Sequence, residues 1–299
     1  MTSAEILNNI NAMAWALEEA GEKLVTLPVI LGIHQRLMTG TRLDEYAGKV
    51  RTEQNWIGGS SSNPCSAEYV PPPAKLVKPL LKDLCEFCRR DDLPVLAKTA
   101  VAHAQFETIH PFADGNGRTG RALIHLLLKQ GGLAPATIPP ISLVLATWAD
   151  DYVAGLSNTR YDGPADGSEA HEALNNWIEL FAAATKRAVE DAEAYEQRVS
   201  ELKKEWRDRL GNPRSHFTAL QLLEILPGVP LITLPSATSL TGRTPPAVNN
   251  AIAKLEEAGI LKQITIGRRN RAFEAPELLD AFSVLVAAAG QPVAEGTTA

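Results

Sequence analysis

The stretch HPFADGNGRTGR, residues 110–121, combines the side chains of acid–base chemistry with those of phosphate binding. Residues 115–117, Gly-Asn-Gly, directly precede a segment with helical spacing, so their backbone N–H groups and the helix N-terminus can surround an anion. Arg118 and Arg121 lie one helical turn apart, where both guanidinium groups can reach the same polyanion. The stretch therefore predicts a site for a phosphate-rich ligand.

Two further side chains fit such a site. Asp114 stands beside the glycines and offers a hard oxygen ligand for Mg²⁺, which is usually held between phosphates and a carboxylate. His110 lies four residues earlier, near enough to take a proton from an incoming hydroxyl. A single histidine or aspartate is usually structural, but the whole set favours chemistry on a phosphate over a purely structural glycine-rich turn.

The letters GNGRTG also match the G-x-G-x-x-G motif of dinucleotide-binding folds. That motif needs a strand directly before it and an acidic residue about 20 positions later. Here a segment with helical spacing precedes the glycines, and APATIPPIS occupies the region where the acidic residue should lie. We therefore reject a dinucleotide fold.

The composition of the 299-residue chain is that of an ordinary globular protein, with 45% hydrophobic and 21% charged residues. Its net charge of −6 argues against a general affinity for nucleic acid or membrane. No apolar run approaches the roughly 18 residues of a membrane span, and the N-terminus lacks the pattern of a signal peptide. Three cysteines cannot form a disulfide framework, so we expect a cytoplasmic protein.

Cys85 and Cys88 form a C-x-x-C pair without the second pair that a zinc site would need. The surrounding segment, LVKPLLKDLCEFC, has the apolar spacing of a helix. This pattern favours two thiols that face the core over a metal or redox site.

The elements that must position the motif are mostly helices. Apolar periodicity and terminal Pro, Gly and Ser signals predict helices over residues 4–20, 27–40, 76–90, 93–109, 121–132 and 173–210. The apolar face of the first helix is predicted to consist of Ile6, Ile10, Met13, Ala14 and Leu17. Residues 51–73 break this pattern, because two glycines and a serine run separate two short extended pieces that end in three prolines. They predict a β-hairpin with a soft tip.

The composition changes near residue 212, and a smaller unit follows. FTALQLLEIL and PSATSLTGR each read as a helix, Thr244 caps a third helix that begins with prolines, and residues 261–275 read as a hairpin that turns at Gly267. This order is typical of a winged helix-turn-helix. Residues 243–271 carry six basic and two acidic side chains, and Arg268, Arg269 and Arg271 lie at the tip of the predicted wing, where DNA phosphates could be met.

The pattern H-P-F-x-D-G-N-G-R-x-x-R is the signature of the Fic family, and residues 110–121 match every fixed position. The chain also resembles the family in its flap, over residues 51–73, and in the approach helix AHAQFETIHPF. The resemblance implies a mainly α fold: a Fic-type helical bundle with a β-hairpin flap, followed by a small α+β winged helix-turn-helix domain. We expect the catalytic domain over residues 1–200, a linker over 201–213, the winged domain over 214–285 and a disordered tail over 286–299.

The resemblance implies a protein adenylyltransferase that moves AMP from ATP, with Mg²⁺, to a hydroxyl of a target protein. It assigns His110 as general base and Asn116 as the group that stabilises charge on the α-phosphate. It assigns Asp114 to Mg²⁺, Arg118 to the pyrophosphate region and Arg121 to the γ-phosphate. The predicted ATP-binding residues are Asp114, Gly115, Asn116, Gly117, Arg118, Thr119, Gly120, Arg121 and Tyr152, and the predicted target-docking residues of the flap are Asn55, Trp56, Ile57 and Gly58. Tyr152 is equally well explained as an aromatic residue on a packed helix.

Three alternatives remain at this stage. The chain could remove AMP from a modified protein, or it could be a nucleotide-sensing regulator that binds DNA through Arg268, Arg269 and Arg271. The winged unit could also serve packing or a homodimer contact instead of DNA binding. The inhibitory pattern [S/T]-x-x-x-E-[G/N] of many relatives does not occur in the chain, which begins at a helix resembling the one after that segment. We therefore expect Arg121 to face no carboxylate from within the chain.

Overall fold

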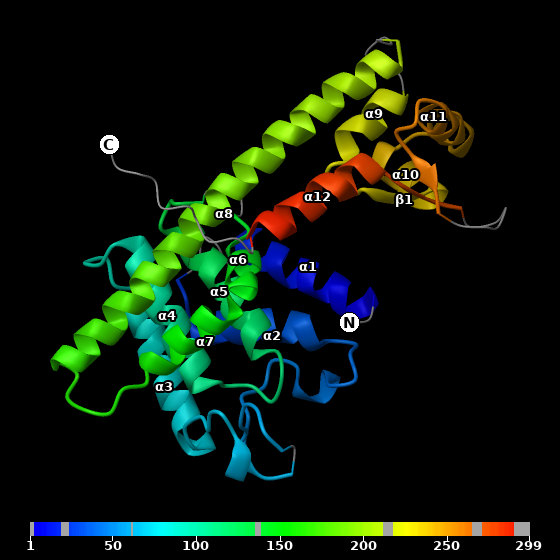
Figure 1. Ribbon diagram of the computed structural model, residues 1–299. Coiled ribbons are helices and arrows are strands. Elements are labelled where there is room, and N and C mark those ends of the chain that lie inside the picture. The colour runs from blue at the N-terminus through cyan, green and yellow to red at the C-terminus, as the bar shows by residue number, and fades with distance from the viewer. Residues whose placement is uncertain are drawn as a thin grey trace, which may run out of the picture. The chain divides into compact units, whose positions relative to one another are not determined.

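The computed structural model describes residues 3–18, 24–60, 62–134, 139–211, 218–264 and 271–289 (Figure 1). The chain forms two compact units, residues 1–186 and 187–299, and each is described by itself. The helix α8 (Ser168–Arg209) contributes to both units, so residues 201–209 of the expected linker are helical. Pairs one turn apart, such as Arg187 with Asp191 at 2.8 Å, support this long charged helix.

The first unit is a bundle of helices, as the periodicity predicts. It contains α1 (Ser3–Glu18), α2 (Leu27–Met38), α3 (Ala74–Cys88), α4 (Val95–Ile109), α5 (Asn116–Gln130), α6 (Ile141–Thr147) and α7 (Ala149–Asn158), with short 3₁₀ turns η1 (Asp44–Tyr46) and η2 (Pro64–Ser66). The predicted helices match α1 to α4 within two residues at each end, whereas α5 begins at Asn116, five residues before the predicted start at 121. The pair α6 and α7 was not predicted as separate helices, because Trp148 divides two segments that are each too short to show a clear period.

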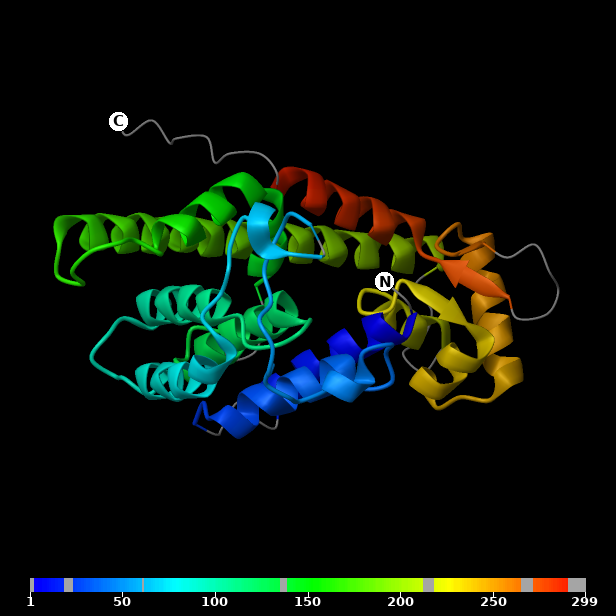
Figure 2. The same cartoon turned by 90° about the horizontal axis from the view of Figure 1, so that it is seen from below.

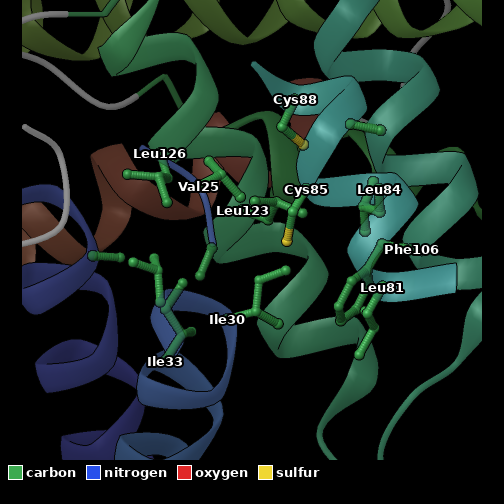
Figure 3. Packing of buried hydrophobic residues seen from close by; sticks show 14 of the residues in the cluster. Val25, Ile30, Ile33, Leu81, Leu84, Cys85, Cys88, Phe106, Leu123 and Leu126 are labelled. Carbon is green, nitrogen blue, oxygen red and sulfur yellow. The ribbon is translucent and has the colours of Figure 1, made fainter. Parts of the chain in front are cut away.

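The core of this unit lies where α2, α3, α4 and α5 meet. Figure 3 shows Ile30 and Ile33 of α2 on the same cluster as Leu84 of α3 and Leu123 of α5. Cys85 and Cys88 belong to this cluster and are buried, which confirms the prediction that both thiols face the core (Figure 3). Burial raises the pKa of the Cys88 thiol to about 12, so it is an inert apolar group at neutral pH.

The predicted apolar face of α1 is wrong in part. Ile6 and Ile10 are 49% and 59% exposed, whereas Ala12 and Ala16 are fully buried. The reason lies in α2, where Gly32 leaves room for the Trp15 ring, since a Cβ at that position would lie 2.7 Å from it. The small side chains therefore face the bundle, although the larger ones gave the stronger periodic signal.

The flap, residues 51–73, is a loop with one β-bridge, between Ile57 and Tyr69, and no strand is assigned in its described part. Gly58 and Gly59 follow the bridge with φ of 73° and 69°, so they turn the chain away before a ladder can form. On the other side, the prolines of residues 71–73 have no N–H to donate. In Figure 1 the light-blue flap extends from the helices at the lower edge, and Figure 2 looks onto it from below.

The second unit contains a small antiparallel sheet among short helices. Its elements are α9 (Thr218–Ile225), β1 (Leu231–Thr233), α10 (Leu234–Thr241), α11 (Pro245–Glu257), β2 (Lys262–Gln263), β3 (Ala272–Glu274) and α12 (Pro276–Ala289). The strand order is β1-β3-β2, with Ile232 opposite Phe273. The order of α9, α10, α11 and the β2–β3 pair agrees with the sequence analysis, whereas β1 and α12 were not predicted. Residues 286–289 of the expected tail belong to α12.

The core of the second unit is formed by apolar side chains of α9, α11 and β3 together with the end of α8. Leu202 and Trp206 of α8 are fully buried with Leu222, Leu255 and Phe273. Across the described residues of both units, no helix combines the length and the apolar character that a membrane span requires.

Candidate functional site

The motif loop, residues 110–115, joins α4 to α5 through two left-handed residues. His110 ends α4 with φ of 47° and ψ of 62°, and it is the only non-glycine residue with positive φ in the described part of the chain. Gly115 begins α5 with φ of 78°, and a Cβ there would lie 3.1 Å from the Met38 sulfur. A non-glycine residue in this region costs roughly 1–3 kcal/mol and is typical of functional sites. His110 is therefore held in a backbone conformation that its residue type disfavours.

The start of α5 has the features of an anion site. No side chain caps this helix, and the first N–H groups of a helix have no partner within it. The Arg121 guanidinium folds back toward this end, since Nη1 lies 3.1 Å from the position of a Cβ on Gly117. Arg118 is largely buried and lies 3.8 Å from Asp114. The structure thus brings both arginines and Asp114 to one helix end, as predicted, while Thr119 and Gly120 are buried beneath them.

Asn116 serves as an internal clamp of the loop. Its Oδ1 accepts from the Phe112 N–H at 2.8 Å and its Nδ2 donates to the Phe112 carbonyl at 2.8 Å, and the residue is buried. Both ends of the amide are thus used on one backbone unit. The role of Asn116 toward an α-phosphate stays a prediction beside this structural role.

His34 of α2 supports the motif loop, and the sequence analysis did not single it out. Its ring stacks on Phe112 at 3.7 Å between centroids with an angle of 2°. Nδ1 accepts from the Gly48 N–H at 3.1 Å, so the proton lies on Nε2, which donates to the Asp114 carbonyl at 3.0 Å. Burial is the main cause that lowers the pKa of His34 to about 4. His34 is therefore a neutral side chain that holds the motif loop against α2.

Arg51 ties the root of the flap to the motif loop and was also missed. It donates through Nε to the His110 carbonyl at 2.9 Å and through Nη1 to the Glu53 carbonyl at 3.0 Å. Its Nη2 donates to the Pro72 carbonyl at 2.5 Å. The backbone N–H of Arg51 reaches the Pro111 carbonyl at 2.9 Å. One buried guanidinium therefore fixes both ends of the flap against the residue predicted to be the base.

The imidazole of His110 lies against a carboxyl group. Nδ1 of His110 is 3.9 Å from Oε2 of Glu107, one helical turn earlier on α4. Burial is the largest cause that lowers the pKa of His110 to about 4, and burial likewise raises the pKa of Glu107 to about 7. Arg121 lowers the pKa of Glu107 in part, so Arg121 has a carboxyl of the same chain within electrostatic reach. The expectation that it faces none is corrected by this neighbour.

Tyr152 of α7 packs inside the bundle against residues of α4 and α8. Its hydroxyl lies 2.9 Å from Nε2 of His103, a buried residue of α4, and its ring contacts Trp177 at 5.8 Å between centroids. Burial raises the pKa of Tyr152, and Glu107 raises it further. These contacts favour the packed interpretation of Tyr152, while its contact with a nucleotide stays a prediction.

The four predicted docking residues of the flap have different surroundings. Asn55 donates from Nδ2 to the Phe112 carbonyl at 3.0 Å, so its side chain holds the flap to the motif loop. Ile57 uses its N–H and carbonyl on Tyr69 and Glu68. Trp56 and Gly58 flank Ile57, and their backbone groups take no part in the Ile57–Tyr69 bridge.

Among the described residues, no group of three or more His, Cys, Asp and Glu side chains could hold a metal ion by itself. Asp114 is a single half-exposed carboxylate beside the anion site. This donor set fits Mg²⁺, which protein sites often hold through one carboxylate and the phosphates of a substrate. The residues therefore suit a metal that arrives with its ligand.

In the second unit, Arg271 donates to Oδ1 of Asn249 on α11 at 2.5 Å and lies over the Phe273 ring at 5.3 Å. Arg268 and Arg269 lie outside the described residues. Contact of these arginines with DNA stays a prediction. In the structure, Arg271 bonds Asn249 of the same unit.

Comparison with known proteins gives a family-model match, curated relatives and a solved structure with a similar fold. Residues 24–128 match the sequence model of the Fic/DOC family. This match contains the flap, α4, the motif loop and nearly all of α5.

Among curated relatives, the chain is 31% identical over 139 residues to protein adenylyltransferase fic-1 of Caenorhabditis elegans, which covers 46% of this chain and 25% of that protein. It is 32% identical over 116 residues to a probable protein adenylyltransferase of Aquifex aeolicus, covering 38% of this chain and 33% of the other. The chain therefore spans about a quarter to a third of the length of these relatives. A Fic family protein of Desulfovibrio desulfuricans has a similar fold, with a TM-score of 0.51 over 92% of this chain and 76% of the other at 21% identity.

Glu107, His34 and Arg51 are the site residues that the sequence analysis missed. Only Glu107 had a usable signal, because it stands one helical turn before His110 on a predicted helix. His34 and Arg51 act through backbone groups that are distant in the sequence, so their spacing carried no information.

Proposed function

We propose that the chain is a protein adenylyltransferase that moves AMP from ATP to a hydroxyl side chain of a target protein. The observation that carries the proposal is the meeting of a strained histidine, an uncapped helix N-terminus and two arginines within a domain of the Fic/DOC family. The names of the curated relatives support the same reaction.

The phosphates of ATP lie at the start of α5, where the free N–H groups and the helix dipole favour negative charge. Arg118 and Arg121 add two fixed positive charges, which phosphoryl chemistry needs more than it needs reactive groups. Asp114 would hold Mg²⁺, which supplies charge neutralisation at the phosphates when it is bound. His110 takes the proton from the target hydroxyl as that oxygen attacks the α-phosphorus.

The target segment adds to the outer edge of the flap. The backbone groups of Trp56 and Gly58 lie outside the Ile57–Tyr69 bridge, and we assign them to contact with an extended target peptide. Arg51 transmits the position of the flap to His110, because it bonds the carbonyls of both. A hydroxyl on the docked segment is thereby held near the base, which is the positioning that such transfers require.

Incubation with ATP labelled at either the α- or the γ-phosphate tests the proposal. Transfer of AMP retains the α-label on a protein and loses the γ-label, whereas phosphate transfer gives the opposite pattern. His110→Ala should abolish the label, and His171→Ala, an exposed histidine of α8, is the matched control. Label that persists in His110→Ala would refute the role of His110.

A cell lysate treated in the same way, followed by mass spectrometry of the labelled peptides, identifies the target and the modified side chain together. If the chain instead strips label from a protein that already carries AMP, the activity is removal and not transfer. If neither transfer nor removal occurs with Mg·ATP, the proposed function is wrong.

A further inference from the structure

Glu107 is a buried carboxyl to which the proposed chemistry has so far given no role. Its side chain is 9% exposed, and Oε1 has no hydrogen-bond partner among the described residues. Oε2 lies 3.9 Å from Nδ1 of His110, a second buried atom that has no hydrogen bond of good geometry among those residues, although the Glu107 backbone lies near enough to raise the pKa of His110 in part. Buried polar atoms are nearly always paired, so a carboxyl and a ring nitrogen left unpaired beside one another require an explanation.

The carboxyl has a place built for it on α5. A Cβ at Gly120 would lie 2.4 Å from Oε1 of Glu107, which is closer than two such atoms can approach. Glycine is otherwise unfavourable in the interior of a helix. The glycine at this position therefore lets the carboxyl of α4 fit against α5 beside the base.

A histidine that acts as a base through one nitrogen must carry its proton on the other. The neutral ring has two tautomers, and the hydrogen bond made by the second nitrogen selects between them. A carboxylate that accepts this hydrogen bond also stabilises the imidazolium that forms during the reaction. For His110, the buried nitrogen is Nδ1, and the group beside it is Glu107.

We infer that Glu107 is the positioning residue of His110, whose carboxylate accepts Nδ1–H and leaves Nε2 to take the proton of the target hydroxyl. The inference rests on the proposed function. In that step the target oxygen forms a bond to the α-phosphorus, and the bond from the α-phosphorus to pyrophosphate breaks. The hydroxyl proton passes to Nε2, and the imidazolium holds it beside the carboxylate until it returns to solvent.

The charge on Glu107 is set by groups of several elements. Burial raises its pKa to about 7, while Arg121 of α5 and Arg160 after α7 oppose this rise. The other titratable groups around the pair are Arg51, His103, Asp114 and Tyr152. Because the pKa of His110 is lowered to about 4, the histidine is already neutral near pH 7 and Glu107 is the group that changes charge there. A carboxyl is ionised above its pKa, so the active form increases as the pH rises through about 7.

Glu107→Gln is the central test, because it keeps the shape and removes the charge. We expect kcat for transfer from Mg·ATP to fall about 10- to 100-fold, less than the loss from removing the base itself, with KM for ATP changed less than about threefold. Asp83→Asn is the matched control, since Asp83 is an exposed carboxylate of α3 that accepts a hydrogen bond from Gln105 of α4, the helix that carries Glu107. It should leave both constants unchanged.

The dependence on pH distinguishes positioning from mere support of the fold. In the parent chain kcat/KM should rise through pH about 7, and this rise should be absent in Glu107→Gln. Glu107→Asp keeps a carboxylate on a shorter arm and should restore part of the rise. A Glu107→Gln chain that keeps the parent's activity and pH profile would overturn the inference, as would a loss confined to KM.

Nitrogen NMR of the His110 ring provides a measurement that needs no transfer. The Nδ1–H tautomer should become more populated as the pH rises through about 7 in the parent chain, and Glu107→Gln should abolish this change. Equal tautomer populations in the two chains would refute the contact. If His110→Ala transfers label as well as the parent, the role of His110 as base fails, and if no chain transfers it, the proposed function fails. In both cases the NMR result still decides whether Glu107 orients the ring.

Discussion

Two helix starts in this molecule look alike in sequence and differ in what surrounds them. The helix α5 begins directly after left-handed Gly115, and α11 begins three residues after left-handed Gly242. Neither receives a hydrogen bond from a capping side chain, and an arginine lies near each. By letters alone, both are candidate anion sites.

The difference lies in donors and in buried polar neighbours. The first turn of α11 contains two prolines, which have no N–H to offer, and Arg243 nearby donates to Gln221 at 2.8 Å. The first turn of α5 contains no proline and so keeps its backbone N–H donors. The strained His110 and the buried carboxyl of Glu107 lie at the end of the preceding helix, α4. We therefore expect an anion to bind at the start of α5 and not at the start of α11. This contrast leads to four predictions.

The largest expected effect is a loss of stability of the first unit in acid. Four buried histidines of this unit have a lowered pKa: about 4 for His34, His110 and His125 and about 3 for His103. Between pH 6.5 and 4 the unfolded chain binds protons that the folded unit does not, so lowering the pH favours unfolding. For fully buried His34 alone, the shift corresponds to about 3 kcal/mol.

Glu107 acts in the opposite direction between pH 4.5 and 7, but it is one group against four. No histidine with a lowered pKa lies in the described part of the second unit. Hydrogen exchange at pH 7 and pH 5, corrected for the intrinsic rate, should show lost protection in α2, α4 and α5 before α9 and α11. His34→Leu should reduce the acid sensitivity, and equal loss of protection in both units would contradict the contrast.

The second effect concerns Arg51, the link between flap and loop. Arg51→Met removes charge-assisted bonds to carbonyls of both segments and should lower the free energy of unfolding by about 2–4 kcal/mol. Denaturant unfolding measures it. Arg42→Met, at an exposed arginine of the same region, should change stability by less than about 0.5 kcal/mol. Equal effects of the two substitutions would show that the clamp contributes nothing.

The third effect separates two amides that bond the same carbonyl. Asn116→Ala removes the acceptor of the buried Phe112 N–H and one donor to the Phe112 carbonyl. It should lower the free energy of unfolding by about 1–3 kcal/mol. Asn55→Ala removes one bond from a partly exposed place and should cost about 1 kcal/mol or less. If Asn116→Ala is as mild as Asn55→Ala in stability yet abolishes transfer, the amide acts on the nucleotide and its clamp role is secondary.

Much of the first unit could be predicted from the sequence, for physical reasons. A helix after the glycine-rich turn was predictable because glycine, asparagine and arginine have local conformational and charge preferences that act within one turn, although α5 begins at Asn116 and not at 121. The face of α1 was not, since the decision depended on Trp15 fitting over Gly32, a contact between two helices. The β-hairpin predicted for the flap is reduced to one bridge for a similar reason. Two short extended pieces around the glycines suggested paired strands, but consecutive glycines with positive φ ended the pairing after one bridge.

The site itself was predicted where its residues lie close together in the chain. His110, Asp114, Arg118 and Arg121 were found because twelve positions hold them all. His34 bonds the Asp114 carbonyl from 80 positions away, and such a contact leaves no mark in a single sequence. Tertiary bonds to backbone carbonyls are therefore the part of the site that required the structure.

The smallest effect is expected at the second helix start. Arg271 already bonds Asn249, so Arg271→Ala should weaken binding to a short DNA duplex by less than about twofold. Arg268→Ala with Arg269→Ala should weaken it more and should reduce the dependence of log affinity on log salt by about 2, since each phosphate contact contributes nearly one to that slope. Fluorescence anisotropy with a labelled duplex, at salt concentrations from about 50 mM to about 200 mM, measures both. No binding at the lowest salt would remove DNA as a partner, and a large effect of Arg271→Ala alone would show that its bond to Asn249 opens to meet the duplex.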